Sequence, residues 1–148
     1  MISGRLVHLI ETNGEQIVDR LVAQIRCNPE MNHARSLPDH ELRQWGQDLL
    51  QHLGHWLAAG NEEELALRYE RLGKLCCEHE IPLHETVRGL CLLREKMLDF
   101  SEEHIISNSS VELYAEEELE RRLGRFFDHL TVHLVLGYER SLRNLVTH

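Results

Sequence analysis

The chain has 148 residues, of which 42% are hydrophobic and 28% are charged, as in an ordinary soluble globular protein. Its net charge of −9 repels phosphate, which argues against binding to nucleic acid. No apolar run approaches the roughly 18 residues of a membrane span, and the first residues do not resemble a signal peptide. We therefore expect one cytoplasmic domain over residues 1–148, with neither a membrane nor a nucleic acid as partner.

Apolar residues recur at helical spacing along most of the chain, and they predict an all-α fold of about five helices. The first helix is expected from about Ser3 to Arg26. It contains Asn13-Gly14, where glycine weakens a helix and predicts a bend. Residues 27–37 include Pro29 and several Asn and Ser residues, which predict a loop.

Three more helices follow, separated by recognisable breaks. The second is expected from Pro38 to Gly60, a residue that readily ends helices. The third is expected to begin at Asn61, with Glu64 completing a capping box, and to end before Ile81-Pro82. The fourth is expected from Leu83 to about Ser107.

The fifth helix is expected from about Val111 to Val146, after a capping box formed by Ser109 and Glu112. At 1.5 Å per residue it would be roughly 54 Å long, which usually exceeds the domain that holds it. Residues 125–140 are apolar on most of the circumference, so the helix must be covered on several sides. It is expected to form the centre of the domain, a subunit interface, or both. Gly137 is expected to permit close approach of another helix, for example the same helix of a second subunit.

Arg94 is the first candidate site residue. It lies in register with Leu90 and Met97 on a face that should be buried, and a buried guanidinium needs a partner. Asp128 is the expected partner in a structural ion pair. Two other interpretations remain: Arg94 lines a pocket for an anionic ligand, or its head extends to solvent.

His133 is the second candidate, because eleven histidines suggest metal or haem. His129 and His133 have a spacing that can chelate a transition metal, but no third ligand stands at a diagnostic spacing. We therefore expect neither a metal nor another cofactor. The four cysteines, with Cys76 and Cys77 adjacent, show no Cys-x-x-Cys pair and are expected to be small buried hydrophobes. No catalytic motif is found, which favours a non-enzymatic role.

Four separated groups of residues resemble one protein family. They are Leu9-Ile10-Glu11 with Ile17-Val18, residues 37–42, Ile81-Pro82-Leu83 leading to Leu92-Leu93-Arg94, and residues 125–128 with Gly137-Tyr138-Glu139. In this order and spacing they are similar to the N-terminal sensory domain of RsbR/RsbRD-type stress-signalling co-antagonists, which also precedes some bacterial histidine kinases. The resemblance implies a globin-like helical bundle, generally without haem, that forms a dimer and passes a signal along its last helix.

The expected function is that of a cytoplasmic, dimeric, non-enzymatic sensory domain in bacterial signal transduction. Because the sequence ends at His148, its output would lie in a downstream domain or a partner protein. The first alternative is a globin-like sensor with haem or another cofactor, ligated through His79, His84 or His133. The second alternative is an all-α metal-dependent enzyme.

Overall fold

The computed structural model describes residues 3–105 and 109–147, and these residues form helices and short connections without a strand. Eight helices are present in this part of the chain. They are α1 (Gly4–Thr12), α2 (Gly14–Arg26), α3 (Asn32–Ser36), α4 (Asp39–Leu50), α5 (Leu53–Leu57), α6 (Glu62–Glu78), α7 (Leu83–Glu103) and α8 (Ser110–Thr147). The all-α prediction is confirmed, and so is the long C-terminal helix. The expected number of about five helices is wrong.

The first additional break separates α1 from α2 at Asn13, where only a bend was expected. The side-chain amide of Asn13 donates to the carbonyl oxygen of Leu9 at 2.8 Å, which offers the backbone an alternative to continuing the helix. Gly14 then packs against α4, where an added Cβ atom would lie 3.5 Å from the Cβ atom of Leu50. The break therefore lets α2 turn to a new direction while the chain stays packed.

The second additional break separates α4 from α5. Leu50 and Leu53, on either side of it, are both fully buried. The carboxylate of Glu11 on α1 accepts the backbone N–H of Gly54 at 3.2 Å, near the start of α5. A side chain from a distant element thus satisfies a backbone donor that the break exposes.

The third difference is the short helix α3 within the loop expected over residues 27–37. Its N-terminal backbone donors bind the carboxylate of Glu85 on α7, with distances of 3.2 Å from His33 N and 3.0 Å from Ala34 N. A negative charge is favourable at a helix N-terminus. Glu85 is 5% exposed, so this buried carboxylate fixes the loop to the body.

The predicted helix ends have mixed outcomes. Gly60 has a φ of +97°, as a terminating glycine requires, although α5 already ends at Leu57. The capping box at Asn61 is wrong, because its side-chain amide donates to His55 O at 2.6 Å instead. Ser109 acts as predicted, with its hydroxyl accepting the N–H of Glu112 at 3.3 Å. The fourth helix ends at Glu103, and its expected end near Ser107 lies outside the described residues.

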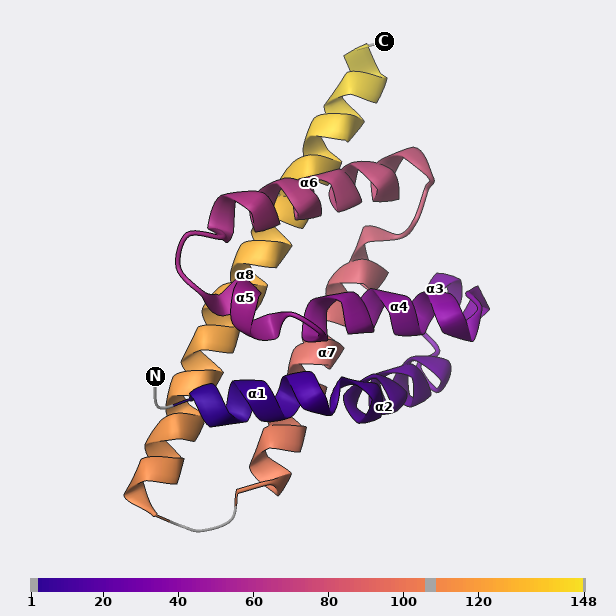
Figure 1. Cartoon of the computed structure of the whole chain (residues 1–148). Coiled ribbons are helices and arrows are strands. Elements are labelled where there is room, and N and C mark those ends of the chain that lie inside the picture. Colours follow the sequence, from indigo (N-terminus) through magenta and orange to yellow (C-terminus); the bar gives the residue numbers. More distant parts are fainter. Residues whose placement is uncertain (1–2, 106–108, 148) are drawn as a thin grey trace.

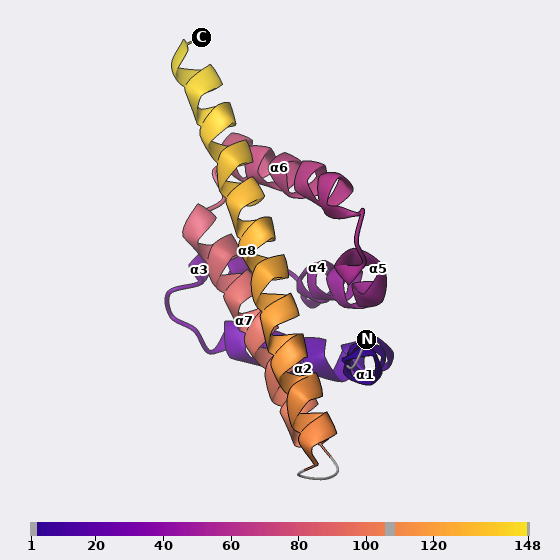
Figure 2. The same ribbon diagram turned by 90° about the vertical axis from the view of Figure 1, so that its left-hand side faces the viewer.

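The longest helices, α7 and α8, form an antiparallel pair that runs through the molecule (Figure 1). α1 and α2 cross this pair on one side, and α6 crosses α8 nearer its C-terminal end. The view at 90° shows α8 extending beyond α6 at that end (Figure 2). The arrangement leaves the C-terminal turns of α8 outside the body.

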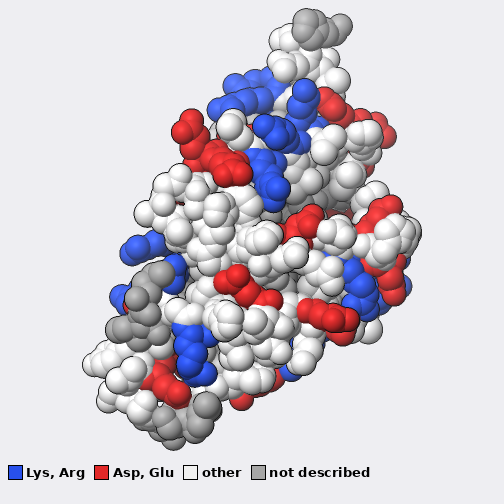
Figure 3. All heavy atoms as spheres, in the orientation of Figure 1, with Lys and Arg blue, Asp and Glu red and all other residues white. Residues whose placement is uncertain are grey.

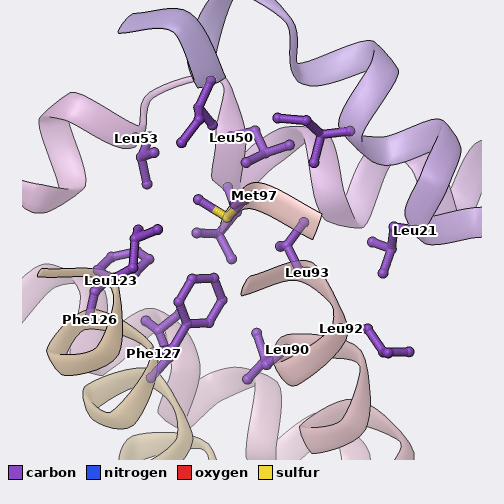
Figure 4. Close-up of a cluster of buried hydrophobic side chains, with 14 of the residues drawn as sticks. Leu21, Leu50, Leu53, Leu90, Leu92, Leu93, Met97, Leu123, Phe126 and Phe127 are labelled. Atoms are coloured by element: carbon purple, nitrogen blue, oxygen red, sulfur yellow. The ribbon is translucent and has the colours of Figure 1, made fainter. Parts of the chain in front are cut away.

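One cluster of buried apolar side chains joins all the helices longer than five residues. Met97 lies near the middle of the labelled side chains, with Leu50 and Leu53 on one side and Leu123 and Phe127 of α8 on the other (Figure 4). α8 therefore contributes to the core along its first three-quarters, as its apolar circumference predicts.

A polar network ties the start of the described chain to α8. The hydroxyl of Ser3 donates to Glu118 Oε1 at 2.6 Å, and the backbone N–H of Ser3 donates to the same oxygen at 3.2 Å. Arg122 donates to the Ser3 hydroxyl at 2.9 Å and to Leu57 O at 3.5 Å. Ser3 is fully buried, so the network holds α1 and α5 against α8.

The network predicts an acid-sensitive contribution to stability. The hydrogen bond from the Ser3 hydroxyl, followed by that from the Ser3 backbone N–H, lowers the pKa of Glu118. Ionised Glu118 therefore stabilises the fold above the unfolded pKa of about 4.3, and this is lost as the pH falls through the lower folded pKa. We expect Glu118→Gln to lower the urea midpoint at neutral pH and to match the wild type in acid, whereas Glu117→Gln should change neither. A Glu118→Gln deficit that is the same at both pH values would contradict this assignment.

Candidate interaction site at the C-terminal helix

The backbones of α6 and α8 touch where Gly73 and Gly137 meet the opposite helix. A Cβ atom on Gly137 would lie 2.0 Å from the carbonyl oxygen of Glu70. A Cβ atom on Gly73 would lie 2.0 Å from Leu134 O and 2.7 Å from Tyr138 N. No real side chain fits at such distances, so only glycine permits this crossing. The expected close approach at Gly137 is confirmed, but the neighbour is α6 of the same chain.

Glu70 joins the two helices at this crossing. Its carboxylate lies 3.1 Å from His133 Nδ1 and also forms an ion pair with Arg140, both on α8. One turn earlier, His129 Nε2 lies 3.0 Å from the carbonyl oxygen of Glu62, at the start of α6. The candidate His133 therefore takes part in the contact between α6 and α8.

The ion pair expected between Arg94 and Asp128 is wrong. Arg94 is half-buried, Asp128 is exposed, and no ion pair joins them. Asp128 follows buried Phe127 by one residue, and successive side chains on a helix point about 100° apart. The buried charged residue of α7 is instead Glu85, which the sequence pattern did not single out.

The histidines and cysteines of the described residues do not gather into one site. The rings of His129 and His133 lie 4.5 Å apart, but the described residues contain no group of three His, Cys, Asp or Glu side chains arranged to hold a metal ion. His79 and His84 are exposed. Cys76 and Cys77 are buried as expected, and burial raises the pKa of the Cys76 thiol. The same expectation is wrong for the other two cysteines, Cys27 and Cys91, which are exposed.

The final turns of α8 leave the body of the domain. Ser141 is its last buried residue, and every residue from Leu142 to Thr147 is exposed. Figure 3 shows Lys and Arg side chains gathered where α8 crosses α6, with an uncharged tip beyond them. This segment lacks the cover that the rest of the helix has.

A row of residues on α8 faces away from the core at alternating spacings of three and four. We call this row the outer seam, and it consists of Val132, Val135, Glu139, Leu142 and Val146. Val132 is 55% exposed, Leu142 is 44% exposed and Val146 is 80% exposed. Spacing of this kind with apolar side chains is typical of the contact line of a coiled coil. Sequence reasoning missed the seam, because the buried and exposed apolar rows together resemble one broadly apolar helix.

Comparison with known proteins adds no relative: no protein-family model, no curated protein and no solved structure matches this chain. Within residues 3–105 and 109–147, no helix combines the length and the apolar character that spanning a bilayer requires.

Proposed function

We propose that this chain is a non-enzymatic, cytoplasmic sensory and dimerisation domain of bacterial signal transduction. Its helices would form a globin-like bundle, and α8 would pass the signal to a downstream domain or a partner protein. The observation that carries the proposal is the outer seam on a helix that leaves the domain. The expectation from the family resemblance points the same way.

A second copy of the chain is the partner that the seam fits best. Val132, Glu139 and Val146 repeat every seven residues, and Val135 and Leu142 repeat between them. Two identical helices with such a row can pair about a two-fold axis, which buries the row of each against the other. The seam continues onto the protruding turns, so pairing there need not disturb the core.

The crossing at Gly73 and Gly137 connects this face to the body. Because the two backbones are in contact, a displacement of α6 must move α8 or open the crossing. A ligand or partner that favours one packing of α6 would therefore favour one geometry of the paired α8 helices. Such a ligand can shift the equilibrium between the two packings only by as much as its binding free energy differs between them.

The seam predicts a dimer that a charge within it disrupts. We expect the variant Leu142→Glu with Val146→Glu to be monomeric, because it would place carboxylates opposite each other in the pair. Both residues are exposed, so the monomer should keep its fold. Light scattering and sedimentation measure the mass, and circular dichroism measures the helix content. Truncation after Gly124 would be a poorer test, because it removes buried core residues of α8.

Two further variants provide the controls. Val111→Glu with Leu113→Glu puts the same two charges at exposed positions near the other end of α8, and it should leave the dimer intact. Glu139→Leu removes the charge already present in the seam, and it should tighten the dimer because a polar residue there weakens pairing. A monomeric wild-type chain, or a dimer unaffected by the double glutamate variant, would overturn the proposed interface.

A further inference from the structure

A pocket of about 200 Å³ lies between α2, α3, α4, α6 and α7, away from the outer seam. Most of its wall is apolar, with Met31, Leu42, Leu72 and Ile81 among the lining residues. Trp45 adds an aromatic wall. A Cβ atom on Gly89 would lie 3.2 Å from the Trp45 ring, so the absence of a side chain at Gly89 leaves room for the indole.

The charged side chains that line the pocket are acidic. Glu85 is buried beside α3, and Glu41 lies exposed in the first turn of α4. The lining contains one imidazole, that of His33, and among the described residues no Lys or Arg. The nearby Arg26 is directed to Leu37 O and Asp39 instead. The pocket therefore repels an anion and attracts a cation, as does the net charge of −9.

Glu85 has capacity for a further hydrogen bond. Each of its two oxygens accepts one backbone N–H of α3, whereas an ionised carboxylate has about four acceptor sites. A ligand ammonium group would add a charge-assisted hydrogen bond without displacing α3. The thiol of Cys76 and the hydroxyl of Thr86 lie 3.6 Å apart, so these two polar groups already satisfy each other.

The volume of the pocket limits the size of the ligand. An apolar cavity of about 150 Å³ holds a benzene molecule, so a pocket slightly larger accommodates one aromatic ring with a short arm. We propose that this pocket binds a small aromatic amine, with its ring among the apolar side chains and Trp45 and its ammonium group at Glu85 and Glu41. This would supply a ligand class for the proposed sensory function. Its test measures binding alone, so the outcome is distinct from that of the dimer test.

Three probes that share a phenyl ring and a two-carbon arm separate the contributions of the ring and of the charge. They are 2-phenylethylamine, the neutral 2-phenylethanol and the anionic 3-phenylpropionate, each titrated into the full chain by isothermal calorimetry. We expect the amine to bind at least roughly tenfold more tightly than the anion, with the alcohol between them. Equal or tighter binding of the anion would overturn the proposal, and so would no binding of any probe at millimolar concentration.

Variants locate the site and test each carboxylate. Glu41→Gln should weaken binding of the amine severalfold and leave that of the alcohol unchanged, whereas Glu85→Gln, which also loosens α3, should weaken the amine more than the alcohol. Ala34→Leu fills part of the pocket and should weaken both probes. Glu63→Gln, an exposed carboxylate outside the pocket, should change neither.

Thermal unfolding of each variant shows whether it is folded during the titration. Because Glu85→Gln also weakens the attachment of α3, Glu41→Gln supplies the independent test of charge. Amine affinity that is unchanged in Glu41→Gln, or unchanged in Ala34→Leu, would overturn the assignment to this pocket.

Discussion

Replacing Gly137 with alanine is expected to destabilise the domain by about 3 kcal/mol or more, at the upper end of the cost of overpacking. The new methyl group would lie 2.0 Å from the carbonyl oxygen of Glu70, and this atom belongs to the backbone of α6. A backbone cannot move aside as a flexible side chain can. The two helices must separate, which would also disturb the contacts of Glu70 with His133 and Arg140.

Gly124→Ala is the matched control on the same helix. A Cβ atom there would meet nothing within 4 Å. Alanine is a better helix former than glycine, so this variant should be more stable by about 0.5–1 kcal/mol. Gly73→Ala should behave like Gly137→Ala, because its methyl group would meet Leu134 O. Urea unfolding followed by circular dichroism measures all three. A Gly137→Ala variant as stable as the wild type would show that the helices do not cross in contact.

Local patterns predicted most of the helices. Three helices begin at or next to the residues that predicted them: α4 at Asp39, α7 at Leu83 and α8 just after Ser109. Such starts are predictable because proline and a capping serine act on the first turn of a helix. Asn13 marked a real break because its side chain competes for backbone hydrogen bonds within one turn. Such signals depend on a few neighbouring residues, and these are visible in one sequence.

Features that depend on distant residues were not predictable in this way. Glu85 stabilises α3 across more than 50 positions of sequence, and Glu11 binds Gly54 across more than 40. Nothing near residue 33 indicates a helix, since its partner comes from α7. The expected ion pair between Arg94 and Asp128 was wrong for the same reason. The pattern within each helix does not determine how α7 and α8 are rotated relative to each other.

The close approach at Gly137 lies between these two cases. A glycine within a helix and without turn residues beside it permits a close neighbour, as Gly73 does within α6, but Gly124 of α8 has no neighbour within 4 Å, so the signal is not specific. Two helices that each carry such a glycine can cross in contact with each other. The sequence alone cannot distinguish this pairing from contact with a second subunit. In the structure this crossing is internal, and the partner proposed above would bind the outer seam instead.

Phe127→Ala is expected to destabilise the domain by about 3–5 kcal/mol, the usual cost of deleting a buried aromatic ring. Phe127 is 3% exposed, its ring packs edge-to-face on Phe126 at 5.3 Å, and it projects from α8 toward Leu90 and Met97 (Figure 4). The substitution would leave a cavity between α7 and α8. Because α7 and α8 are the two longest helices, we expect neighbouring side chains to fill this cavity only in part.

Two variants distinguish lost packing from a general intolerance of change in α8. Tyr114→Ala removes an aromatic ring that is 61% exposed on the same helix, and it should change stability by about 0.5 kcal/mol or less. Phe127→Leu keeps most of the apolar volume and should lose less than Phe127→Ala. Urea midpoints give the order of the three. If Tyr114→Ala cost as much as Phe127→Ala, the face of α8 assigned to the core would be wrong, and with it the outer seam on the opposite face.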